Sequence, residues 1–205
     1  MGKIDYRKTM KALYLPSARE AAIVDVPGMN FAMIDGAGDP NGSKTFQDAV
    51  EALFAVSYTL KFTVKKGPSG IDYAVMPLEG LWWMEGPGEF DASRKDLWLW
   101  TVMIAQPEPV TKELFKEAVA RVREKSDPPA LPGIRFEAFA EGRAAQMLHV
   151  GPFDAEGPTI EKVHRFAAEH GFRLRGKHHE IYLSDFRRTA PAKLKTVVRH
   201  PVEKA

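Results

Sequence analysis

The sequence predicts an α+β fold. In this fold, duplicated βαββ units form a pseudo-two-fold antiparallel sheet with helices on one side and a central ligand cleft. Three observations support it. Short β-rich stretches precede amphipathic helices, the same order of elements recurs after a proline-rich linker, and the 205 residues are 44% hydrophobic, enough to build a real core. We expect a single domain over residues 1–205, with half-repeats at roughly 20–126 and 134–202 and a cleft where they join.

The first half opens with residues 1–19, which read as a polar lead-in. Two strands are expected at 22–27 and 31–36, because both stretches are rich in β-branched and apolar residues and end at proline or glycine. Ser43 has the side chain of a helix N-cap, and apolar residues at helical spacing follow it to about Lys65.

Strand character returns at residues 72–84 and again at 97–104, and the glycine- and proline-containing segment 86–88 suggests a hairpin loop between them. An amphipathic helix is expected from Thr111, which would cap it, to Lys125.

The second half follows a linker at 127–133 and repeats this order. Thr159 is expected to cap its helix, which ends at Gly171. The expected strands of this half are 134–139, 144–150, 180–183 and 193–198. Sequence identity between the halves is low, so the repeat is inferred from the order of elements.

Composition excludes several classes of protein. A net charge of +2 does not indicate nucleic-acid binding, and the absence of cysteine excludes disulfides and thiolate chemistry. No apolar run approaches the roughly 20 residues of a membrane span, and the N-terminus has no apolar signal region. We expect a cytoplasmic protein that binds no membrane and needs no cofactor.

Glu180 and Tyr182 form the leading candidate site. Alternation along a strand places both side chains on one face, with Ile181 on the other. If that face is apolar and enclosed, Glu180 has the chemistry of a general base or of a partner for a cationic ligand, and Tyr182 that of an orienting phenol. The alternative is an ordinary surface pair.

All four tryptophans fall on two neighbouring predicted strands, as Trp82, Trp83, Trp98 and Trp100. Adjacent strand residues face opposite ways, so one of Trp82 and Trp83 can pack in the core while the other lines a cleft. The cluster is either core packing or an aromatic wall for a flat or cationic ligand. Glu79 shares the face of Trp83 and is expected on the surface.

Metal and nucleophile chemistry find little support. His149, His178 and His179 do not form a recognised ligand motif, so no metal site is expected. The sequence has neither a GxSxG nucleophile elbow nor a phosphate-binding loop. The remaining histidines, His164, His170 and His200, are expected at the surface.

Several separated motifs resemble the GyrI-like small-molecule-binding domain family, and particularly its stand-alone branch, over nearly the whole chain. The segments that carry the resemblance are 57–62, 77–83, 149–153, 177–185, 187–191 and 194–197. The resemblance implies a duplicated βαββ fold whose cleft holds a buried glutamate among aromatic residues, and by motif match that glutamate is Glu180.

The stand-alone branch is similar to hydrolases that open the strained ring of cyclopropanoid alkylating compounds. The resemblance therefore implies that Glu180 activates a water molecule and that Tyr182 assists it as a phenol. The residues expected to hold the aromatic or hydrophobic ligand are Trp82, Trp83, Tyr58, Phe54, Met103, His149 and His178.

Two alternatives accompany this interpretation. The chain is either an enzyme of that kind or a non-catalytic module that sequesters hydrophobic or cationic drugs, or inhibits a protein partner such as gyrase. No helix-turn-helix pattern is found, so direct DNA binding is not expected. Phe186 stands where the resemblance leads one to expect proline, and Phe153 where tyrosine is commoner; both departures bear on ligand specificity.

Overall fold

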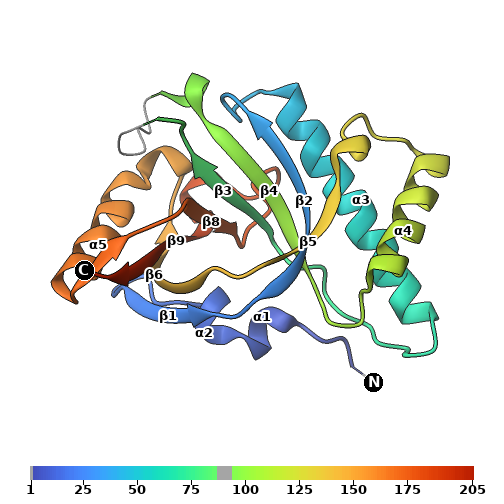
Figure 1. Ribbon diagram of the computed structural model, residues 1–205, viewed down its shortest axis with the longest axis horizontal. Helices are drawn as coiled ribbons and strands as arrows, with labels where there is room; N and C mark the ends of the chain where they lie inside the picture. Colours follow the sequence, from blue (N-terminus) through green and yellow to red (C-terminus); the bar gives the residue numbers. More distant parts are fainter. Residues whose placement is uncertain (1, 87–93) are drawn as a thin grey trace. The chain divides into compact units, whose positions relative to one another are not determined.

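The computed structural model describes residues 2–86 and 94–205, and this part of the chain contains five α-helices and nine strands (Figure 1). The helices are α1 (Tyr6–Thr9), α2 (Lys11–Tyr14), α3 (Lys44–Lys66), α4 (Lys112–Lys125) and α5 (Gly157–Glu169). The strands are β1 (Ala22–Val26), β2 (Met29–Ala37), β3 (Leu78–Trp83), β4 (Leu99–Gln106), β5 (Arg135–Phe139), β6 (Gly142–Val150), β7 (Phe172–Leu174), β8 (His178–Tyr182) and β9 (Lys195–Lys204). Short 3₁₀ turns include η2 (Leu131–Gly133) and η3 (Phe153–Ala155).

The chain forms two compact units. The described residues of unit 1 fall within Met1–Tyr6, Met29–Leu78 and Trp82–Phe139. Those of unit 2 are Arg7–Gly28, Glu79–Leu81 and Ala140–Ala205. Strand β3 contributes residues to both units.

Unit 1 has the strand order β3-β4-β2-β5, and α3 packs on β2, β4 and α4. The predicted caps of both helices are confirmed. The Ser43 hydroxyl accepts a hydrogen bond from the Phe46 amide, and the Thr111 hydroxyl accepts one from the Leu114 amide. Each hydroxyl thereby satisfies one amide that a helix N-terminus leaves unpaired.

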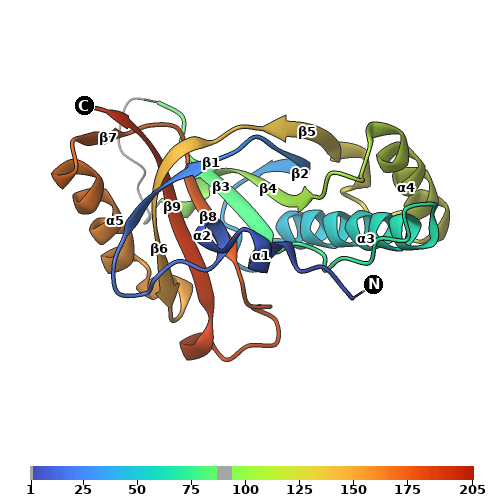
Figure 2. The same cartoon turned by 90° about the horizontal axis from the view of Figure 1, so that it is seen from below.

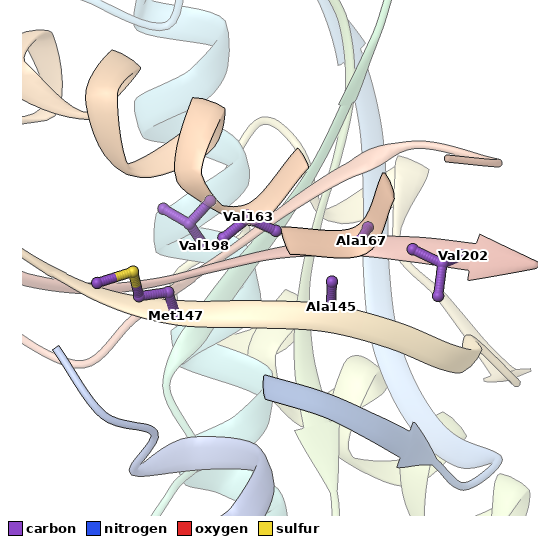
Figure 3. Close-up of a cluster of buried hydrophobic side chains, with 6 residues drawn as sticks. All are labelled: Ala145, Met147, Val163, Ala167, Val198 and Val202. Atoms are coloured by element: carbon purple, nitrogen blue, oxygen red, sulfur yellow. The ribbon is translucent and has the colours of Figure 1, made fainter. Parts of the chain in front are cut away.

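Unit 2 has the strand order β1-β6-β9-β8-β3, and β7 also pairs with β9. Helix α5 covers β6 and β9 by packing small and β-branched residues against them (Figure 3). The buried cluster consists of Ala145, Met147, Val163, Ala167, Val198 and Val202. Val198 and Val202 share one face of β9, so this face carries α5.

The predicted α+β class with an antiparallel sheet is confirmed, and the sheet of the described residues is open, because its end strands β1 and β5 do not pair with each other. Within unit 2, Figure 2 shows α5 beside β6 and β9. The duplication, the single-domain boundaries and the ligand cleft stay predictions. No helix within residues 2–86 and 94–205 has the length and apolar character needed to cross a membrane.

Some element predictions were wrong. The lead-in 1–19 contains α1 and α2, and Leu13 and Tyr14 are buried, because an irregular pattern of two short helices escapes a periodicity test. The strand expected from residue 72 begins only at Leu78, and β7 was not predicted. Of the predicted loop 86–88, Pro87 and Gly88 lie outside the described residues.

Thr159 does not cap α5, which begins two residues earlier at Gly157. Pro158 suits the first turn of a helix, where its missing amide hydrogen costs nothing. The Thr159 hydroxyl lies instead 3.0 Å from Nδ1 of His149.

Candidate functional site

Strand β8 carries two different sets of polar side chains on its two faces. His178, Glu180 and Tyr182 share one face, since both neighbours reach the Glu180 carboxylate. His179 points the other way, into a separate ionic network. The predicted alternation of Glu180 and Tyr182 on one face is therefore what the strand adopts.

The Glu180 carboxylate is held by two hydrogen bonds. Nε2 of His178 donates to Oε1 at 3.1 Å, and the Tyr182 hydroxyl donates to Oε2 at 2.7 Å. The side chain keeps 15% of its surface exposed. Burial alone would raise the pKa of Glu180, but the bonds from His178, Tyr182 and Glu156 outweigh it and lower that pKa.

Glu156, directly before α5, supplies a second carboxyl group. It is 3% exposed and lies against the Glu180 carboxylate and the Thr196 hydroxyl. Burial, and then the negative charge of Glu180, raise the pKa of Glu156 to about 9. At neutral pH the pair therefore holds one proton, which resides on Glu156.

The surroundings of Glu156 support the same protonation state. Oε1 of Glu156 is buried and finds no hydrogen-bond donor among the described residues. Two ionised carboxylates in contact would repel each other, whereas a neutral Glu156 can donate a hydrogen bond to Glu180. Like other interacting carboxyl pairs, Glu156 and Glu180 titrate together and hold one proton between them.

The segment that carries Glu156 is fixed by His149. Nε2 of His149 donates to the Pro152 carbonyl at 3.2 Å, and Nδ1 lies 3.0 Å from the Thr159 hydroxyl. His149, expected as a ligand contact, has both ring nitrogens engaged in holding the turn before α5.

Aromatic rings stand beside the carboxylate face. The Phe153 ring packs edge-on to Tyr182 at 5.5 Å between centroids, and Phe186 lies 6.2–6.3 Å from both. The two residues at which the chain departs from the family pattern therefore flank Tyr182. Their influence on ligand choice stays a prediction.

The opposite face of β8 holds a buried ionic network. Nδ1 of His179 donates to both oxygens of Glu141 at 3.0 Å, and Nε2 donates to Glu79 at 3.0 Å. Arg199, with no exposed surface, donates to Glu141 at 3.1 Å. The Tyr14 hydroxyl completes the network by donating to Glu79 at 2.9 Å.

Both nitrogens of His179 donate to carboxylates, so the ring is an imidazolium. Burial lowers its pKa, but Glu141 and Glu79 outweigh burial and raise the pKa to about 9. For Glu141, burial is outweighed by His179 and Arg199, which lower its pKa to about 2. The two cations and two carboxylates balance, which is the condition for burying charge.

The network predicts a fall in stability at alkaline pH. The His179 pKa is higher in the folded state than its ordinary 6.5, so its contribution is complete below pH 6.5 and is lost as pH rises through about 9. The free energy of unfolding in urea should decrease over this range, and less so in His179→Gln. Glu156 adds a decrease between pH 4.5 and about 9 that is common to both proteins. Equal slopes in the two proteins would contradict the prediction.

Two further expectations for single residues were wrong. Glu79 was expected at the surface, but it is fully buried, because Tyr14 and His179 provide the partners that make burial of a carboxylate tolerable.

His164 and His200 were also expected at the surface, but they are partly buried against each other, with 3.3 Å between Nε2 of His164 and Nδ1 of His200. Burial, followed by the charges of His178 and His164, lowers the pKa of His200 to about 3. His170 is exposed as predicted.

The aromatic candidates belong to unit 1. Trp82 is buried, stacks on Phe46 at 6.0 Å and meets Trp98 edge-on at 5.4 Å, whereas Trp83 is only partly buried. Of the adjacent pair, Trp83 thus keeps the accessible surface. Trp100 is also buried and meets Phe46 at 5.3 Å.

The other candidates of unit 1 differ in exposure. Tyr58 is half exposed on α3 beside the partly buried Phe54, with 6.2 Å between ring centroids. Met103 is fully buried in β4. The roles predicted for these residues in holding a ligand stay predictions.

The structure brings together Glu180, Tyr182 and His178 from the predicted set, and adds Glu156, which was missed. In sequence, Glu156 is one acidic residue in a polar turn before Gly157-Pro158, and only the tertiary fold sets it against Glu180. No group of three or more histidine, aspartate or glutamate side chains within the described residues is arranged to hold a metal ion.

The fold and the buried carboxylate face can be compared with those of known small-molecule-binding domains. The family model for the GyrI-like small molecule binding domain matches residues 19–203. The chain belongs to this family.

Several solved structures are similar to this chain. An uncharacterized conserved protein from Listeria innocua is 41% identical, with a TM-score of 0.89, and the match covers 98% of this chain and 100% of that one. A second Listeria innocua protein, described as a hydrolase, is 39% identical with a TM-score of 0.85 and the same coverage. The EcmrR C-terminal domain shares the fold, at 13% identity and a TM-score of 0.54 over 91% of this chain and 98% of that one. No curated protein matches the chain.

Proposed function

We propose that the protein is a hydrolase that opens the strained ring of cyclopropanoid-type electrophilic aromatic compounds with a water molecule activated by Glu180. The main observation behind this proposal is that Glu180 is an oriented, partly exposed carboxylate with a lowered pKa. The similarity to a Listeria innocua protein described as a hydrolase supports the proposal.

The chemistry requires a base and a route for electrons. The water oxygen forms a bond to a ring carbon, and the carbon–carbon bond of the strained ring breaks. The electron pair moves to a conjugated carbonyl oxygen of the substrate, which takes up a proton. Glu180 accepts the proton that the water loses, and strain in the ring supplies much of the driving force.

Glu180 retains an acceptor position for that water. An ionised carboxylate has about four lone-pair positions, and His178, Tyr182 and Glu156 occupy three of them. One position is left for a water molecule. The Tyr182 hydroxyl donates to Glu180 in this state, so its first role is to orient the base; it becomes available to the substrate oxygen once Glu180 is protonated.

The test follows product formation from a cyclopropanoid alkylator. We expect wild-type protein to accumulate ring-opened product and Glu180→Gln to lose at least about a hundredfold in rate, because the amide cannot accept the proton. Glu161→Gln, an exposed position on α5, is the matched control and should retain the wild-type rate. Equal rates in wild type and Glu180→Gln would refute the role of Glu180.

A binding module is the second candidate function. The carboxyl pair carries one net negative charge beside the rings of Phe153, Tyr182 and Phe186, an arrangement suited to an organic cation. Stoichiometric binding of the alkylator or of an aromatic cation by both wild type and Glu180→Gln, with no ring-opened product, would favour this candidate.

A further inference from the structure

We propose that Glu156 is a positioning residue that acts through Glu180: it stays neutral at physiological pH and donates the hydrogen bond that keeps the Glu180 carboxylate ionised and oriented. This inference rests on the proposed function for its activity readout, but its central claim, a protonated Glu156, is tested without any substrate.

The burial of Glu156 and the lack of a donor for one of its oxygens indicate that this carboxyl group is neutral. Glu156 is 3% exposed, and its Oε1 has no donor among the described residues. An ionised carboxylate in this place would be desolvated, and one of its oxygens would lack a donor, which is costly. A neutral carboxyl group contacting a carboxylate forms a strong, charge-assisted hydrogen bond instead.

The groups around Glu156 and Glu180 favour one negative charge on the pair over two. From β8 the pair faces His178, Tyr182 and Glu180 itself, and from β9 it faces the Thr196 hydroxyl. The largest influences on the pKa values of the two carboxyl groups come from burial, from each other, and from His178, Tyr182 and Thr196. A single negative charge is therefore stabilised there by His178 and Tyr182, whereas a second charge is opposed by burial and by the charge of Glu180.

The low exposure of Glu156 separates its role from that of Glu180. The Glu180 side chain is 15% exposed, whereas Glu156 is 3% exposed and is linked to the base through its hydrogen bond to Glu180. Removing the proton of Glu156 at high pH would put two repelling carboxylates side by side and disturb the base.

Infrared spectroscopy of the full chain tests the protonation state. Wild type at pH 7 should show the carbonyl band of a protonated carboxyl group, and the band should disappear as pH rises through about 9. Glu156→Gln should lack the band, and Glu161→Gln should keep it. A wild-type spectrum without this band at pH 7, or a band that survives in Glu156→Gln, overturns the proposal whatever the protein does to a substrate.

Activity supplies a second, separate readout. An amide at position 156 still donates a neutral hydrogen bond, so Glu156→Gln should lose no more than about threefold in rate, whereas Glu156→Leu should lose about tenfold to a hundredfold. Above pH 9, Glu156→Gln should lose less activity than wild type; both keep His179, so the difference isolates Glu156. An equal loss in the Gln and Leu variants contradicts the positioning role. If the infrared band titrates as expected but wild type makes no product, the proposed reaction is wrong. The protonated state of Glu156 beside Glu180 is then still supported.

Discussion

Replacing Arg199 by methionine is expected to lower the free energy of unfolding by about 3–5 kcal/mol, the usual cost of removing one partner from a buried ion pair. Arg199 has no exposed surface and donates to three different groups. Its Nη1 reaches Glu141 at 3.1 Å, its Nε reaches Gln146 at 2.8 Å, and its Nη2 reaches the Leu13 carbonyl at 2.7 Å. The variant leaves all three acceptors short of a donor in the interior.

The change should also loosen α2 from the rest of unit 2. Arg199 binds the carbonyl of Leu13, and Gln146 donates to the carbonyl of Ala12, so both residues hold this short helix. Hydrogen exchange of residues 10–15 should therefore become faster in Arg199→Met than the global loss of stability explains. Urea unfolding and hydrogen exchange measured on the same sample separate the two effects.

Arg143 offers the matched control within unit 2. It pairs with Asp25 at 3.0 Å, but its side chain is 45% exposed and that of Asp25 is 74% exposed. Water screens such a pair, so Arg143→Met should cost less than about 1 kcal/mol. A loss in Arg199→Met no larger than that in Arg143→Met would show that the buried network is not the source of stability.

The sequence predicted the elements whose signals are local. The caps Ser43 and Thr111 were read correctly because an N-cap depends only on a side chain and an amide three residues later. Glu180 and Tyr182 were placed on one face because strand alternation is equally local.

The parts that escaped prediction depend on contacts distant in the chain. Glu79 looked like a surface residue because its partners, Tyr14 and His179, lie 65 and 100 residues away. Glu156 gave no signal because nothing in its own turn distinguishes it from a solvated acid. Both became recognisable only when the fold brought each carboxylate to a partner that explains its burial.

The two faces of β8 connect stability to the candidate site. His179 is anchored by Glu141 and Glu79, and its neighbours His178 and Glu180 project from the opposite side of the same backbone. A charge network that fixes the strand therefore also fixes the base. Variants of the network should be compared at conditions where they remain folded before any change in activity is assigned to the site.

Replacing Gly36 by alanine is expected to cost about 3 kcal/mol, near the upper end of what overpacking usually costs. Gly36 on β2 lies directly opposite Trp100 on β4, and the indole covers the glycine. An added Cβ would stand 2.1 Å from two ring carbons, far inside van der Waals contact. Because Trp100 also packs on Phe46, the displaced indole should disturb the aromatic cluster, and the near-ultraviolet circular dichroism of the tryptophans should change with the loss of stability.

Gly133 in η2 is the control for this substitution, since nothing lies within 4 Å of an added Cβ there. Gly133→Ala should leave stability within about 0.5 kcal/mol of wild type. A double variant, Gly36→Ala with Trp100→Leu, should cost less than the sum of the two single changes, because the smaller side chain makes room for the methyl group. Strict additivity would mean that the alanine methyl is accommodated by a shift of β2 and not by the indole, and the close pairing of Gly36 with Trp100 would then not be what fixes the tryptophan cluster.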